Sequence, residues 1–230
     1  FEHGISYLGD DKWASKYDIS LDLFDLAAEA ACVLNKNAAV TSYTEELVAN
    51  AKSFDDILNS LAVYAKCLHQ VGLLKQSMES SMGTLSKLGE QPLRDMSDDT
   101  LIADTVSMNE ILRNMPDESI LNLHENKAKK NTITLEIYPN LCHVFHLAKP
   151  SLIGSASLRM IELTMNRGLA SSSPIAFGYY GCVLVTNESV EEGCRLGRLA
   201  LKLVENKLSL VHKSAVIALV YHCILWASDP

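Results

Sequence analysis

The chain has 230 residues, 48% of them hydrophobic and 21% charged, which is enough apolar surface for a folded core and excludes disorder as its main state. A formal net charge of −8 disfavours nucleic acid as a partner, because phosphate recognition needs a basic surface. No run of 18 apolar residues offers a membrane span, and no signal peptide opens the chain, so we expect a cytoplasmic protein with no membrane partner.

The charge is uneven along the chain. Residues 1–60 contain 11 acidic and 4 basic residues, a net of −7, whereas residues 61–230 contain 17 acidic and 16 basic residues, a net of −1. The acidic residues of this first part are either a solvated helix face or a docking face for a basic neighbour.

The six cysteines form no C-x-x-C pair, and each lies in an apolar helical context. Free cysteine behaves as a small buried hydrophobe, and reduced thiols are typical of the cytosol. We therefore expect six buried, reduced thiols: Cys32, Cys67, Cys142, Cys182, Cys194 and Cys223.

The amino-terminal part has the periodicity of successive amphipathic helices. In residues 17–34 the apolar positions recur every three or four residues: Leu21, Phe24, Ala28, Ala31 and Leu34. The pattern resumes in residues 38–52. Ser53 then caps a helix that reaches about Val71, with Asp56 completing a capping box. Gly72 is suited to end that helix, and residues 73–88 form the next one.

The central part is less regular, and a sub-boundary is possible near residues 90–97. Ser97 is placed to cap a helix that Pro116 ends. Residues 117–130 are polar and carry a small basic cluster: Lys127, Lys129 and Lys130. We interpret these lysines as solvated, with phosphate binding as the alternative.

Residues 132–137 alternate like a strand, but no neighbouring segment offers a partner strand, so we expect helix there. Pro139 and Pro150 bracket a further apolar helix, and residues 151–166 form another one before Gly168.

The last third has clear helical periodicity. Pro174 suits the first turn of a helix that ends at Val185. Residues 187–189 are the turn that follows; they also match a glycosylation acceptor, but a turn between helices is the interpretation we prefer. Residues 190–206 and 210–226 form the final two helices.

Small residues recur at a fixed spacing on successive helices. Three pairs of residues are 12 positions apart: Ala28 and Val40, Ala65 and Ser77, and Gly181 and Gly193. Gly197 and Ala200 add small residues to the helix that contains Gly193. The first two pairs start 37 residues apart, close to the length of a tetratricopeptide-like unit. We therefore predict an all-α fold, a tetratricopeptide-like α-solenoid of antiparallel helix pairs, over an antiparallel bundle, which would also place small residues at its crossings.

Several segments resemble one known family. Residues 1–8, Trp13, residues 17–23 and residues 27–30 are similar to the start of the helical-repeat region in large multidomain signalling ATPases and kinases. Residues 173–181 and 193–201 are similar to two later helices of that region, with Cys194 in place of an aromatic residue. Residues 222–226 and Pro230 resemble its ending with altered spacing, and residues 115–116 and 149–152 fit its middle section.

The resemblance covers nearly the whole chain and rests on packing motifs. In that family the region follows a P-loop ATPase module, often with a serine-threonine kinase domain before it and a GAF domain and a histidine kinase or cyclase after it. It implies that residues 1–230 are one helical-repeat region of a longer protein, a scaffold that links a nucleotide-binding switch domain to an output domain.

The sequence contains no P-loop, no G-x-G-x-x-G and no kinase catalytic loop, so we expect no cofactor within this segment. Cys142 and His146 are four residues apart and would share a helix face. With His143 they are candidate metal ligands, but zinc needs three or four ligands, and the nearby chain adds only His124 and Glu136. The alternative is that all three are ordinary residues of an apolar helix.

We therefore expect no catalytic residue and a protein partner, either a neighbouring domain or a peptide. Two alternatives stay open: a metal- or ligand-binding helical regulatory domain, and a helical regulatory enzyme with a deep polar pocket.

Overall fold

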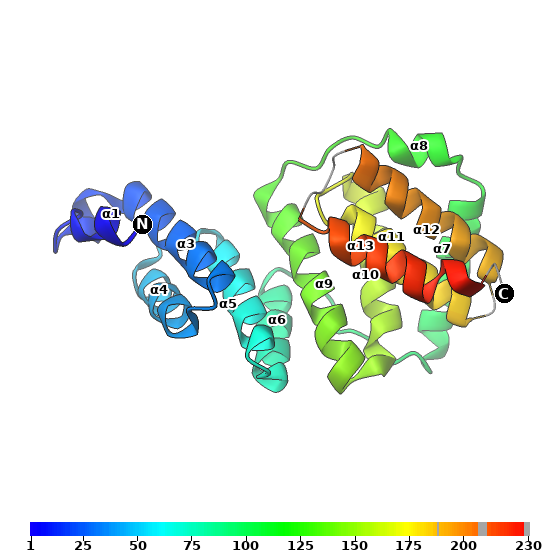
Figure 1. The fold of residues 1–230 in the computed structure, drawn as a ribbon, viewed down its shortest axis with the longest axis horizontal. Coiled ribbons are helices and arrows are strands. Elements are labelled where there is room, and N and C mark those ends of the chain that lie inside the picture. Colours follow the sequence, from blue (N-terminus) through cyan, green and yellow to red (C-terminus); the bar gives the residue numbers. More distant parts are fainter. Residues whose placement is uncertain (188, 207–210, 228–230) are drawn as a thin grey trace. The chain divides into compact units, whose positions relative to one another are not determined.

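The computed structural model describes residues 1–187, 189–206 and 211–227. This part of the chain is all-α, as predicted, with no strand beyond one isolated bridge between Glu125 and Leu169. None of its helices is long and apolar enough to span a bilayer. The α-helices (Figure 1) are α1 (Glu2–Ser6), α2 (Lys12–Ser15), α3 (Tyr17–Val33), α4 (Asn37–Asn50), α5 (Leu58–Gln70), α6 (Leu74–Lys87), α7 (Asp99–Arg113), α8 (Asp117–Leu121), α9 (Lys129–Ala148), α10 (Ile153–Arg167), α11 (Ser173–Thr186), α12 (Val190–Glu205) and α13 (Lys213–Cys223).

The chain folds as two compact units, residues 1–91 and residues 92–230. Unit 1 contains two helical hairpins, α3–α4 and α5–α6, and α5 packs against both α3 and α4. Its core is formed by the apolar face of α3, where Phe24, Ala28 and Ala31 are buried, and by Val40 and Leu47 of α4.

The turns of unit 1 follow the sequence signals. Ser53 and Asp56 form the predicted capping box, which opens a 3₁₀ turn, and α5 itself begins at Leu58. Gly72 follows α5 with a φ of +78°, a conformation that glycine adopts without strain. Ser77 of α6 donates a hydrogen bond to the carbonyl of Ala65 on α5 at 2.7 Å, so this small-residue pair lies at the crossing of the second hairpin.

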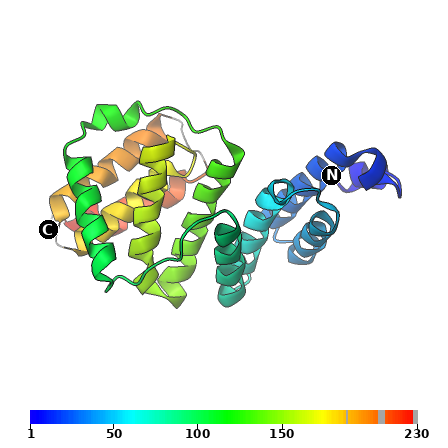
Figure 2. The ribbon, with the colours of Figure 1, turned by 180° about the vertical axis from the view of Figure 1, so that it is seen from behind.

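Unit 2 is built around α10 and α11. Helix α10 packs against α7 and α9 (Figure 2), and α11 packs against α10 and α12. Helix α13 lies on α11 and α12 (Figure 1). The largest fully buried side chains of this unit include Tyr138, Phe145, Phe177 and Tyr180.

Helices α11 and α12 cross closely at glycines. A Cβ on Gly193 would lie 2.6 Å from Cγ2 of Val185 and 2.7 Å from the carbonyl oxygen of Gly181. A Cβ on Gly197 would lie 3.2 Å from side-chain atoms of Ile224, and Ala200 is fully buried one turn further along α12. The absent side chains of Gly181 and Gly193 therefore set the distance between α11 and α12, and that of Gly197 lets Ile224, which follows α13, approach α12.

Arg195 of α12 forms hydrogen bonds to the end of α7 and to the segment that follows it, and so holds that segment against α12. Its guanidinium donates to Asp117 at 2.8 Å, to Glu192 at 2.6 Å, and to the carbonyl oxygens of Leu112 at 3.0 Å and Met115 at 2.7 Å. A planar group with several donors is needed to reach all four acceptors at once.

Pro139 was expected to begin a helix, but it lies inside α9 and is buried. A proline removes one main-chain hydrogen bond, and the helix continues because Tyr138, Leu141 and Cys142 around it are fully buried. The expected polar stretch 117–130 also contains a short helix, α8.

Ser97 was expected to cap α7, but Asp98 is the cap. Ser97 instead bonds Asp95 through its backbone N–H and its hydroxyl. A carboxylate accepts two N–H groups of the first helical turn more strongly than a hydroxyl does.

Two further expectations need correction. Cys182 is partly exposed and Cys223 is exposed, so the six free cysteines are not all buried. The last helix begins at Lys213 and ends at Cys223, shorter than residues 210–226. Residue 210 and residue 188 of the expected turn lie outside the described residues.

Candidate functional site

Helix α3 carries a stripe of exposed aliphatic side chains on its outer face. Ile19, Leu26 and Val33 are 57%, 45% and 76% exposed. They are seven residues apart, which places them almost in line along a helix. We call these three residues the α3 stripe.

The α3 stripe is not used by the core of unit 1. The buried face of α3, which includes Phe24, Ala28 and Ala31, packs against α4 and α5 on the other side of the helix. A helix that is apolar on two faces has one face left for another partner.

An acidic row runs beside the α3 stripe. It consists of four residues at helical spacing, Asp18, Asp22, Asp25 and Glu29. Asn59 of α5 donates its amide to Asp25 at 2.9 Å and to Glu29 at 2.6 Å. Because Asn59 is neutral, it orients these carboxylates without cancelling their charge. Asp18 and Asp22 are exposed, and neither makes an ion pair within residues 1–91.

The start of α3 is held in place by polar contacts to the rest of unit 1. The Tyr17 hydroxyl donates to Asp56 at 2.6 Å and accepts from the backbone N–H of Lys52 at 2.7 Å. The Tyr17 hydrogen bond favours the ionised carboxylate and lowers the pKa of Asp56 below its ordinary value. Trp13 donates to Glu46 of α4 at 2.7 Å. The stripe and the row therefore lie on a fixed support.

The three candidate metal ligands do not converge. Cys142 is fully buried and burial raises the pKa of its thiol, whereas His143 and His146 are exposed. Cys142 and His146 thus lie in different environments despite their spacing of four residues. His143 lies edge-on to Tyr179, with ring centroids 6.0 Å apart. Among the described residues, no group of three or more histidine, cysteine and acidic side chains could hold a metal ion.

Glu136 of α9 is at the centre of a second polar cluster of unit 2. Its carboxylate bonds His212 at 2.9 Å and accepts from the hydroxyl of Ser171. Burial raises the pKa of Glu136, but the hydrogen bonds and charge of His212 and the bond from Ser171 outweigh burial, and the net shift is downward. Ser171 bonds the carboxylate rather than the imidazole, so His212 is not placed to accept its proton as a catalytic triad requires. The cluster joins the loop before α11 to α9.

Sequence reasoning identified the acidic residues of the amino-terminal part but missed the α3 stripe. The signal was present, because Ile19, Leu26 and Val33 recur every seven residues. The apolar residues of the buried face of α3 are more numerous, so their pattern dominates the periodicity of this segment.

No protein-family model matches the chain, and neither a search of curated proteins nor a search of solved structures finds a match. The function is therefore argued from the residues themselves.

Proposed function

We propose that this chain is a non-catalytic helical-repeat scaffold that binds protein, and that the outer face of α3 is a docking surface for a basic amphipathic helix. The observation that carries the proposal is the α3 stripe beside an acidic row whose members Asp18 and Asp22 make no ion pair within unit 1.

The packing of unit 1 supports the solenoid part of the proposal. Helix α5 opens the second hairpin and contacts both helices of the first hairpin, which is how successive helix pairs stack in tetratricopeptide-like repeats. The sequence resemblance to signalling ATPases and kinases motivates the place of this scaffold between a nucleotide-binding switch domain and an output domain. A P-loop encoded upstream of residue 1 would support that context, and an upstream sequence without one would remove it.

The exposed aliphatic residues and the acidic row on α3 indicate what kind of helix can bind there. The three stripe side chains are between 45% and 76% exposed. Covering each of them contributes about 1–2 kcal/mol, so together they supply most of the affinity. The acidic row adds attraction to lysine or arginine, which raises the association rate and rejects acidic helices. The partner is therefore a helix with an aliphatic residue every seventh position, flanked by basic residues.

A designed peptide tests this surface. The probe is a fluorescein-labelled three-heptad peptide with leucine at every seventh position and lysine beside each leucine, and its binding to the full chain is followed by fluorescence anisotropy. Leu26→Asn removes the centre of the stripe without changing charge, and we expect about tenfold weaker binding, equivalent to about 1.4 kcal/mol.

The matched control is Val48→Asn on α4. The exposed fraction of Val48, 50%, is similar to the 45% of Leu26, but Val48 lies on another helix. We expect this variant to bind the peptide as the unaltered chain does. Equal affinities for all three proteins would contradict the α3 docking surface.

A further inference from the structure

Two cysteines of unit 2 meet between α11 and α13. Cys182 of α11 and Cys223, the last residue of α13, are hydrogen-bonded through their thiols. Cys223 is exposed and Cys182 is partly exposed, whereas the other four cysteines of the chain are buried. A reagent in solution therefore reaches these two thiols more readily than any other. We call them the Cys182–Cys223 pair.

Close packing of α11 on α13 brings the two sulfurs together. A Cβ on Gly178 of α11 would lie 2.9 Å from Cδ2 of Leu219 on α13, so the absent side chain lets the helices approach. Cys182 follows Gly178 by four residues, and Cys223 follows Leu219 by four residues. The pair thus lies about one helical turn beyond this contact on both helices.

A second contact holds the end of α13 beside the pair. A Cβ on Gly181 would lie 2.9 Å from Cδ1 of Ile224, and these two residues are the sequence neighbours of Cys182 and Cys223. The thiol of Cys194 on α12 also donates to the carbonyl of Ile224 at 3.7 Å. A disulfide needs Cβ atoms about 4 Å apart, and thiols already in hydrogen-bond contact need only a small movement to reach that distance.

The two thiols differ in environment, and the difference gives each of them a role. Burial, the charge of a Cys223 thiolate and the hydrogen bond to the Cys223 sulfur all raise the pKa of the Cys182 thiol. A hydrogen bond raises a thiol pKa when it stabilises the protonated form, so Cys182 is the donor. Cys223 is the exposed acceptor, and an oxidant reaches its sulfur first.

We propose that the Cys182–Cys223 pair is a reversible modification site, at which a hydroperoxide oxidises the two thiols to a disulfide and a dithiol reduces it again. The Cys223 sulfur attacks the peroxide, takes one oxygen and becomes a sulfenic acid. With hydrogen peroxide, the other oxygen leaves as water after it takes the Cys223 proton. This site lies in unit 2 and does not depend on the α3 docking surface.

The second step closes the disulfide. The Cys182 sulfur attacks the Cys223 sulfur, the S–O bond breaks, and the hydroxide that leaves takes the Cys182 proton to form a second water. The two sulfurs together lose two electrons, and the peroxide gains them. A dithiol reverses the reaction by two thiol–disulfide exchanges and leaves as its own disulfide.

The disulfide would tie α13 covalently to α11. A cross-link restricts the unfolded chain and so stabilises the folded state. We therefore expect oxidation to raise the Tm of unit 2 by about 5–10 °C, and reduction to reverse the rise.

Peptide mapping of the oxidised full chain tests the proposal. The reduced protein is treated with equimolar hydrogen peroxide at low protein concentration and digested, without reduction, by a protease that cuts after glutamate. Glu191 and Glu192 lie between Cys182 and Cys194, so the digest separates these two cysteines. We expect one main cross-linked product, which joins the Cys182 peptide to the Cys223 peptide and disappears with dithiothreitol.

Three variants assign the roles. Cys182→Ser should stop the reaction at the sulfenic acid of Cys223, which dimedone labels. Cys223→Ser changes an exposed position, so it should fold as the unaltered chain does, form no disulfide and show no rise in Tm; it keeps the test decisive should Cys182→Ser not fold. The matched control is Cys194→Ala, which removes the other thiol near the end of α13 and should keep the cross-link and the rise in Tm.

Four results would overturn the proposal. Thiols that stay reduced, or a sulfenic acid on Cys223 of the unaltered chain with no disulfide, would show that the pair does not close. A disulfide from Cys223 to Cys194 would show a different partner. A cross-linked dimer on a non-reducing gel that Cys223→Ser abolishes would show that Cys223 pairs with a second chain. Dimedone labelling of Cys182 in Cys223→Ser would show that Cys182 is the thiol attacked first.

Discussion

Replacing Gly193 by alanine tests the close crossing of α11 and α12. The added Cβ would lie 2.6 Å from Cγ2 of Val185 and 2.7 Å from the carbonyl oxygen of Gly181, well below the 3.4–4 Å of ordinary contact. The carbonyl belongs to the backbone, and valine has little rotamer freedom in a helix, so the helices must separate. Overpacking of this kind lowers the free energy of unfolding by up to about 3 kcal/mol. The higher helix propensity of alanine raises it by about 1 kcal/mol.

The net expectation is a loss of about 2 kcal/mol in the free energy of unfolding, or about 4–8 °C in Tm for a unit of this size. Urea unfolding and a thermal melt followed by circular dichroism measure it. Gly181→Ala should cost less, because its Cβ meets Cδ1 of Ile224, a side-chain end that can turn away, at 2.9 Å and the Gly193 oxygen at 3.0 Å. Gly181→Leu should cost more than Gly181→Ala.

The matched control is Gly83→Ala on α6, where a Cβ would meet nothing within 4 Å. This substitution should raise the stability of unit 1 by about 0.5–1 kcal/mol through helix propensity alone. A Gly193→Ala protein that gains stability as the control does would refute the tight crossing.

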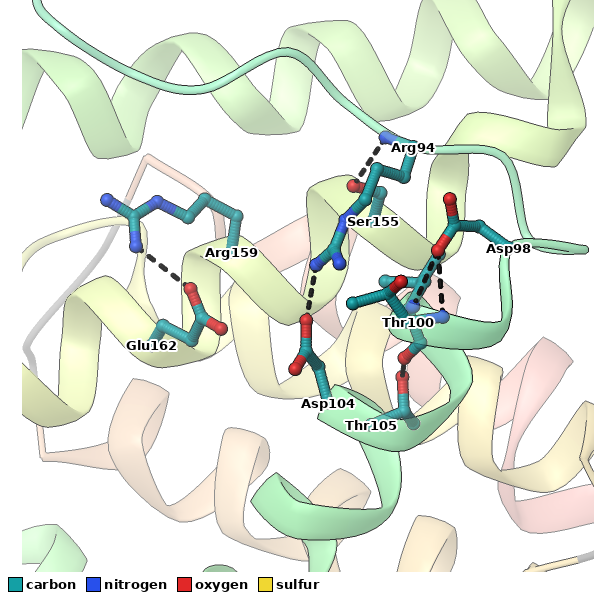
Figure 3. A network of polar contacts seen from close by, with 9 residues as sticks. Arg94, Asp98, Thr100, Asp104, Thr105, Ser155, Arg159 and Glu162 are labelled. Atoms are coloured by element: carbon teal, nitrogen blue, oxygen red, sulfur yellow. Dashed lines mark hydrogen bonds and ion pairs between the residues drawn. The ribbon is translucent and has the colours of Figure 1, made fainter.

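Three further substitutions follow from the structure. Arg195→Lys should lower the free energy of unfolding by about 2–3 kcal/mol, because lysine cannot bond four acceptors at once, whereas Arg198→Lys at an exposed site on the same helix should change it little. Glu136→Gln should destabilise unit 2 at pH 7 and much less at pH 3. The folded-state pKa of Glu136 is lowered, so its stabilisation is present above the unfolded pKa of about 4.3 and is lost as pH falls through the folded value; unfolding curves of both proteins at the two pH values check this. Asp98→Ala should lower the free energy of unfolding because α7 loses its helix cap (Figure 3), measured by urea unfolding, and an unchanged free energy would contradict the capping role.

The all-α class and most helix positions could be predicted because they depend on local periodicity. Ser53 with Asp56 and Gly72 are signals that act within one or two helical turns, and each behaves as its residue type indicates. Helix boundaries were less predictable. Pro139 indicates a helix start by itself, but burial of its neighbours in unit 2 keeps it inside α9, and that burial depends on the tertiary fold.

The candidate sites depend still more on tertiary contacts. The α3 stripe was visible in the spacing of Ile19, Leu26 and Val33, but which of two apolar faces a helix buries is decided by its neighbours. The spacing of Cys142 and His146 suggested a shared helix face, but Cys142 is fully buried and His146 is exposed.

A charge swap tests the docking surface on α3 most directly. Asp18→Lys and Asp22→Lys together reverse the exposed part of the acidic row, and anisotropy titrations compare the lysine-flanked peptide with one in which glutamate replaces every lysine. The unaltered chain should prefer the basic peptide and lose that preference as salt is raised, and the double variant should prefer the acidic peptide. Unchanged affinities of both peptides for both proteins would contradict a docking surface for basic helices on α3.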